Sequence, residues 1–141
     1  MKPRTTLTKL FSALALAAVF SVCAATTAQA GPQPHLKTGM FGVARGQVAR
    51  INAVHVGDPN IRPIEIEMLL LDATGAVVGR DMKTIAPGEA VFFDVAAGEN
   101  RMELRAVVTK LGGPDTKLLT TVEVFDNDTG KNTIFIGDPG L

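Results

Sequence analysis

The chain has 141 residues with 14 basic and 14 acidic side chains, and residues 1–30 account for three of the basic ones and none of the acidic ones. The remaining 111 residues are mildly acidic, fit one domain, and contain no cysteine, serine, tyrosine or tryptophan. This composition excludes disulfides, thiolate metal sites and serine or cysteine nucleophiles, and the lack of a basic stripe argues against nucleic acid as a partner.

Residues 1–30 have the three-part pattern of a secretory signal peptide. Basic side chains in the first nine residues precede an apolar run over residues 10–25, and an Ala-Gln-Ala triplet ends at Ala30. The apolar run is shorter than the roughly 20 residues that a membrane-spanning helix needs. Lipid attachment at Cys23 is disfavoured because Val22, rather than a small residue, comes directly before it. We therefore expect a secreted or periplasmic protein, cleaved near Ala30.

Residues 31–39 follow the predicted cleavage site and include Pro32 and Pro34. Proline has no backbone N–H to donate to a sheet, and the segment shows no alternation of apolar and polar residues. We expect an extended, loosely held N-terminal arm here, followed by a single domain over residues 40–141.

The domain alternates apolar and polar side chains with a period of two, which indicates β-strands that bury one face. Clusters of Gly, Pro, Asp and Asn separate the alternating runs and can reverse the chain. The clearest runs place these side chains inward: Ile64, Ile66, Met68 and Leu70 in one, and Met102, Leu104, Ala106 and Val108 in the other. We expect strands at residues 40–45, 47–56, 63–71, 76–85, 89–95, 101–110, 117–126 and 131–137.

One of these runs, over residues 47–56, is less regular. Its apolar residues lie at odd positions up to Ala53 and at even positions from Val54 onward. Such a change of phase predicts a β-bulge near residues 53–55.

The spacing of the strands predicts the fold class. Seven or eight short strands in about 100 residues, separated by turns, are typical of an antiparallel β-sandwich of the immunoglobulin or fibronectin type III kind. A closed barrel is the competing architecture, and alternation alone does not distinguish the two.

The segment DNDTG, residues 126–130, poses a choice between a calcium loop and a hairpin turn. An EF-hand loop needs oxygen ligands at its first, third and fifth positions, glycine at the sixth and glutamate at the twelfth. Counted from Asp126, the third position is Asp128, but the fifth is Gly130 and the sixth is Lys131. We therefore predict a hairpin turn in which Gly130 takes a positive φ, with calcium at Asp126 and Asp128 as the alternative.

Copper binding is a second metal hypothesis, based on the two histidines of the chain, His35 and His55. Four methionines accompany them in the domain: Met40, Met68, Met82 and Met102. Two of the methionines fall on inward faces of predicted strands, where packing is their ordinary role. We expect no catalytic residues, no cofactor and no resident metal.

Five segments follow one another in a distinctive order: RGQVARINAV (45–54), LDATG (71–75), IAPGEA (85–90), ELRAVV (103–108) and EVFDNDTGK (123–131). This order resembles a group of uncharacterised bacterial exported proteins. The resemblance implies a single immunoglobulin-like sandwich domain without an assigned activity, and it carries no catalytic or ligand-binding residues over to this chain.

These patterns together predict an exported, non-catalytic β-sandwich module with an interaction or structural role in the bacterial envelope or outside the cell. The expected partner is another envelope or extracellular protein, bound at a strand edge or through the loops at residues 57–62 and 111–117. The alternative is a periplasmic metal-binding protein that holds copper through histidine and methionine, or calcium through Asp126 and Asp128.

Overall fold

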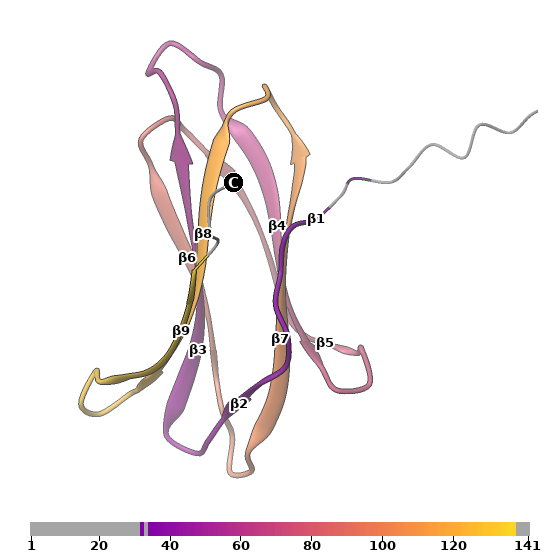
Figure 1. Ribbon diagram of the computed structural model, residues 1–141, viewed down its shortest axis with the longest axis vertical. Coiled ribbons are helices and arrows are strands. Elements are labelled where there is room, and N and C mark those ends of the chain that lie inside the picture. Colours follow the sequence, from indigo (N-terminus) through magenta and orange to yellow (C-terminus); the bar gives the residue numbers. More distant parts are fainter. Residues whose placement is uncertain (1–31, 33, 138–141) are drawn as a thin grey trace, which may run out of the picture.

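The computed structural model describes residues 32 and 34–137, so the predicted signal peptide lies outside the described residues. This part of the chain contains nine strands and no helix (Figure 1). The strands are β1 (Pro34–Lys37), β2 (Phe41–Val43), β3 (Gln47–Val56), β4 (Ile64–Asp72), β5 (Val77–Ile85), β6 (Ala90–Ala96), β7 (Met102–Gly112), β8 (Lys117–Asp126) and β9 (Asn132–Gly137). The eight predicted strands are all present, with ends within two residues of those expected.

The strands form two antiparallel sheets that face each other with their strands along the long axis of the molecule (Figure 1). Sheet A has the order β5, β4, β7, and the far side of β7 pairs with both β1 and β2. Sheet B has the order β6, β3, β8, β9. Because each sheet ends in edge strands, the fold is a β-sandwich, and the closed-barrel alternative is wrong.

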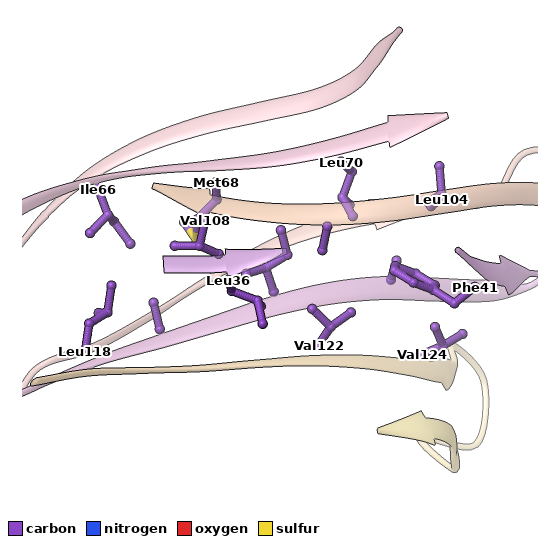
Figure 2. Packing of buried hydrophobic residues seen from close by; sticks show 14 of the residues in the cluster. Leu36, Phe41, Ile66, Met68, Leu70, Leu104, Val108, Leu118, Val122 and Val124 are labelled. Carbon is purple, nitrogen blue, oxygen red and sulfur yellow. The ribbon is translucent and has the colours of Figure 1, made fainter. Parts of the chain in front are cut away.

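The core lies between the sheets and consists of the inward positions of both (Figure 2). The inward sets predicted from the two clearest alternating runs are confirmed: Ile64, Ile66, Met68, Leu70, Leu104, Ala106 and Val108 are fully buried, and Met102 packs against them. Each fully buried Ile, Leu or Met side chain stabilises the fold by about 1.5–3 kcal/mol. This packing holds the described part of the chain together without a disulfide.

The N-terminal arm is more ordered than predicted, because residues 34–37 form β1 at the edge of sheet A. Leu36 lies opposite Val108 and is buried, which fixes the segment to the core. Between β1 and β2, the Thr38 N–H donates to Ala106 O at 3.0 Å, and the Ala106 N–H donates to Thr38 Oγ1 at 2.9 Å. The threonine hydroxyl thus takes the place of a strand carbonyl, and β1 and β2 act as one interrupted edge strand.

The β-bulge predicted near residues 53–55 is wrong. Strand β3 pairs with β8 without a register shift, and the inward positions continue in phase from Ala53 to His55. The residue on the core side is therefore a histidine, whereas Val54 and Val56 point outward. A polar residue at an inward position made the phase look reversed in the sequence.

Candidate interaction surface

His55 lies near the end of β3 with its ring fully buried between the sheets. Its Nδ1 is 3.2 Å from the carbonyl oxygen of Ile85, and its Nε2 is 2.8 Å from Oγ1 of Thr116. Since a carbonyl oxygen can only accept, Nδ1 carries the hydrogen and the Thr116 hydroxyl donates to Nε2. The ring joins the ends of β3 and β5 to the segment that enters β8.

His35 reaches from the edge of sheet A to sheet B. Its Nε2 is 2.5 Å from the carbonyl oxygen of Leu118 in β8. The last described pair between β8 and β9 is Thr121 with Gly137, so Leu118 lies beyond the part of β8 that β9 covers. The histidine side chain therefore bonds a carbonyl of β8 that lies beyond the described pairs between β8 and β9.

The four methionines of the domain lie in different surroundings, two within the sandwich and two on its surface. Met68 is fully buried in the core and Met102 packs against it, as predicted, whereas Met40 and Met82 are about half exposed. Within residues 34–137, no group of three or more His, Cys, Asp or Glu side chains is arranged to hold a metal ion. The contacts of both histidines in this region are those of structural hydrogen-bonding groups.

The predicted hairpin at residues 126–130 is confirmed: it joins β8 to β9, and Gly130 has a φ of +68°. The Asp126 carboxylate accepts hydrogen bonds from the Thr129 N–H at 2.8 Å and the Thr129 hydroxyl at 2.7 Å. These bonds, that of the hydroxyl foremost, hold the pKa of Asp126 below its ordinary value. In the shorter turn between β4 and β5, the Asp72 carboxylate accepts from the N–H and the hydroxyl of Thr74, and the hydroxyl likewise lowers the pKa of Asp72.

The loops at residues 57–62 and 111–117, predicted as binding loops, come together at one end of the sandwich. A hollow of about 470 Å³ opens between them. Arg62 and Glu65 are the charged residues of its lining, and Gly113 forms part of its wall. The hollow holds one charge of each sign and no convergent set of donors, so it does not define a ligand.

The outer face of sheet B carries three phenylalanines, which we call the phenylalanine face: Phe92 on β6, Phe125 on β8 and Phe135 on β9. Phe92 is 58% exposed and Phe135 is 65% exposed. Exposed apolar side chains that gather on one face mark interaction sites, and aromatic residues are enriched in protein interfaces.

Arg50 on β3 organises the centre of the phenylalanine face. Its guanidinium lies 4.3 Å from the ring centre of Phe92 and 4.9 Å from that of Phe125. It also makes a two-pronged ion pair with Asp94, with both N–O distances at 2.7 Å. The bond to Asp94 raises the pKa of Arg50 above its ordinary value. The arginine thus fixes Phe92 and Phe125 at either side of it.

A second polar group links the remaining strands of the face. Asn52 on β3 donates to Glu123 on β8 at 3.1 Å, and Asn132 on β9 donates to the other oxygen of Glu123 at 2.9 Å. One carboxylate therefore ties β3, β8 and β9 together on the solvent side. With Arg50 and Asp94 joining β3 to β6, the face is held in place across all four strands of sheet B.

The outer face of sheet A differs in character. Its exposed apolar side chains include Val78 and Met82, and one of its ion pairs joins Glu67 to Arg80 at 2.5 Å. None of the phenylalanines in the described part of the chain lies on this face. The two outer faces therefore offer a matched comparison, one aromatic and one aliphatic.

The four edges of the sandwich also differ in how well they are protected against pairing with another strand. Edge strand β5 directs Asp81 and Lys83 toward the inner side, opposite Met68 and Ile66, and inward charges block strand addition. Edge strand β6 contains Asp94, and the β1–β2 edge is interrupted and begins at a proline. Strand β9 alone among the longer edge strands has neither a charged residue nor a proline.

The sequence interpretation missed the phenylalanine face. It assigned Phe92, Phe125 and Phe135 to strands without noting that all three fall on the outward positions of one sheet. The available signal was the identity of the outward positions: β6, β8 and β9 each carry a phenylalanine at a position of the face where a polar side chain is expected. Recognising their common face required the strand order of sheet B, which the sequence pattern does not contain.

Searches of protein-family models, curated proteins and solved structures find no significant match to this chain. The described residues also include no helix long and apolar enough to cross a membrane.

Proposed function

We propose that the protein is an exported, non-catalytic interaction module that binds another envelope or extracellular protein through the phenylalanine face of sheet B. The observation that carries the proposal is the exposure of Phe92 and Phe135 on a face that Arg50 and Glu123 hold rigid. Export rests on the signal-peptide pattern of residues 1–30.

The energetics of such a face favour binding. Phenylalanine and arginine contribute large contact areas, and interface residues that matter most are enriched in aromatic residues and arginine. Because the side chains of Phe92 and Arg50 are already in contact, little side-chain freedom would be lost on association. A rigid, exposed and partly aromatic surface is the kind that gains free energy from burial.

The arrangement of the central strands supports an immunoglobulin-like type. In that type, the second and fifth strands are neighbours in one sheet, and the third and sixth are neighbours in the other. Here β3 pairs with β6 and β4 pairs with β7, which fits those positions. The outer strands depart from the standard order, since β8 lies beside β3 and the β1–β2 edge strand lies beside β7.

Site-specific photo-crosslinking in the producing cell tests the proposal. A photoreactive amino acid placed at Phe92 should give a discrete crosslinked species of higher mass, because the probe lies on the proposed contact surface. The matched control is the same probe at Met82, which has comparable exposure on the opposite sheet. Equal crosslinking from both faces, or none from Phe92, would contradict the proposed use of sheet B.

A variant at Arg50 supplies the second arm. Arg50→Ala removes the group that holds Phe92 and Phe125 in place, so the Phe92 crosslink should fall while the protein remains folded. Arg80→Ala on sheet A is the matched control, because it also removes one surface ion pair. If both variants reduced the crosslink to the same extent, the effect would not come from the phenylalanine face.

A further inference from the structure

Strand β9 ends sheet B, and within the described residues one side of its backbone is unpaired. Among the described strands, its neighbour is β8 alone. The strand NTIFIG is free of charge and proline, and its residues are mostly β-branched or aromatic, which are the properties that favour pairing with another strand.

The hydrogen-bond pattern identifies the free backbone groups of β9. The N–H of Asp126 in β8 donates to Lys131 O, so Asp126 directs its backbone groups toward the β9 side. Backbone groups alternate along a strand, so Val124 and Val122 do the same. Their partners in β9 are Ile134 and Ile136, which therefore face β8. The N–H and C=O of Phe135 consequently point to the open edge.

We propose that β9 pairs in antiparallel fashion with β9 of a second copy of this chain, across a two-fold axis at Phe135. The pairing would join the two four-stranded sheets B into one continuous eight-stranded sheet. At the axis, the two Phe135 residues would exchange both of their free backbone hydrogen bonds. This inference goes beyond the proposed function, because it concerns the edge of sheet B rather than its outer face.

The side chains of β9 are compatible with such self-pairing. In the register centred on Phe135, Ile134 faces Ile136 of the second copy on the inner side of the sheet. Both isoleucines are half-buried against the core, so each would cover the exposed part of the other. On the outer side, the two Phe135 rings become a cross-strand aromatic pair, and Thr133 faces the small Gly137 of the second copy.

Charge further favours a second copy as the occupant. A two-fold axis brings each residue near its own equivalent, so a charged strand would place like charges close together. Within 132–137 there is no charge to repel. At the opposite sheet, an equivalent pairing of β5 centred on Asp81 would bring two carboxylates together. The β9 edge, which has no charge or proline to block strand addition, is thus also the edge at which two copies can pair without repulsion.

The dimer would also place two phenylalanine faces side by side on one surface. Phe135 on β9 lies directly opposite Glu123 on β8, and Glu123 lies opposite Arg50 on β3. In the joined sheet, the Phe135 pair would therefore lie between two Arg50 clusters. The dimer would therefore offer a partner protein two adjoining phenylalanine faces, which together have twice the area of one.

Placing a charge at the proposed two-fold axis, at Phe135, is the direct test. The protein, expressed from the full 141-residue sequence, is examined by light scattering after gel filtration, with circular dichroism to verify the fold. We expect the parent to elute at twice the chain mass, and Phe135→Lys and Phe135→Glu each to elute as monomers. An equimolar mixture of the two variants should regain the dimer, because the axis places Lys and Glu directly opposite each other.

The backbone contribution is tested by comparing Phe135→Ala with Phe135→Pro. Both variants remove the ring, but proline also removes the free N–H that faces the open edge, while leaving the bonds of Ile134 and Ile136 to β8 intact. We expect the alanine variant to weaken the dimer at least tenfold and the proline variant to lose it. Val78→Lys, on the outer side of sheet A, should leave the dimer unchanged.

Three results would overturn the proposal: a parent that is monomeric at every concentration, a mixture of folded Lys and Glu variants that stays monomeric, or a dimer that Val78→Lys disrupts equally. A monomeric parent would leave the proposed function standing, because the Phe92 crosslink does not depend on the edge. Conversely, a dimeric protein that gives no Phe92 crosslink would contradict the proposed function and leave the dimer proposal standing.

Discussion

Gly113 and Gly130 both have a positive φ, +103° and +68°, but they differ in what surrounds them. A β-carbon added at Gly130 would meet no atom within 4 Å. One added at Gly113 would lie 2.9 Å from Ile64 Cα and 2.9 Å from the carbonyl oxygen of Pro63. Alanine at Gly130 therefore tests backbone strain alone, whereas alanine at Gly113 tests strain together with a collision with fixed backbone.

The two costs can be separated from these contacts. A left-handed backbone penalises alanine by about 1–2 kcal/mol, and the stiffer unfolded chain returns about 0.4–1 kcal/mol, so Gly130→Ala should destabilise the protein by about 1 kcal/mol. Overpacking adds about 1–3 kcal/mol, so Gly113→Ala should cost about 2–4 kcal/mol. At about 4–8 °C per kcal/mol for a domain of this size, the falls in Tm are about 5 °C and about 15 °C.

Far-UV circular dichroism is the suitable assay, because residues 31–141 contain no tryptophan or tyrosine for fluorescence. Thermal melts and urea titrations of the parent and both variants give the free energies of unfolding. Equal losses at the two glycines would refute the reasoning, since they would mean that the segment at Pro63 and Ile64 yields freely to a new side chain. A loss of several kcal/mol at Gly130 would contradict the open surroundings of that turn.

Three further predictions concern turns and histidine. Asp128→Ala should leave the Tm within about 1 °C of the parent, in calcium and in chelator alike, because the turn bonds come from Asp126; a calcium-induced rise in the parent that the variant loses would favour the calcium alternative. The folded-state pKa values of Asp72 and Asp126 lie below the ordinary 3.8, so their contribution to stability is complete above that pH and is lost as the pH falls through the lowered values. In urea titrations from about pH 5 downward, the stability difference between the parent and an Asp72→Asn/Asp126→Asn variant should narrow; a constant difference would contradict this. His55→Phe should cost about 2–4 kcal/mol in urea unfolding, because Ile85 O and the Thr116 hydroxyl lose a buried partner, whereas His35→Phe, at an exposed position, should cost less.

The sequence predicted the core best in strands whose inward positions are all apolar. Residues 64–70 and 102–108 alternate cleanly because their inward positions are all apolar, and the structure buries the predicted residues. The prediction failed at His55, since a buried histidine with both ring nitrogens bonded looks polar in the sequence and behaves as core in the fold. It also failed at β1, where Leu36 is the single apolar anchor and gives no periodic signal.

The candidate surface was less predictable than the fold, because its parts come from distant segments. Arg50 and Asp94 are 44 residues apart, and Asn52 and Glu123 are 71 apart. Alternation tells which side chains share a face of one strand, but it does not tell which strands are neighbours. The ion pair and the ring contacts follow from the order of sheet B, and that order is a property of the whole chain.

The strand order also determines when during folding the sheets can form. Of the strands that follow one another in sequence, β4 with β5 and β8 with β9 pair directly, whereas β7 pairs with β1, β2 and β4, and β8 pairs with β3. Closing such long loops costs entropy before any contact is gained, so folds with many distant pairs fold slowly. Sheet A cannot be completed before residue 112 is available, nor sheet B before β9. A chain with this topology can complete neither sheet until most of residues 34–137 have been synthesised, and this delay would keep it unfolded for the export that we propose.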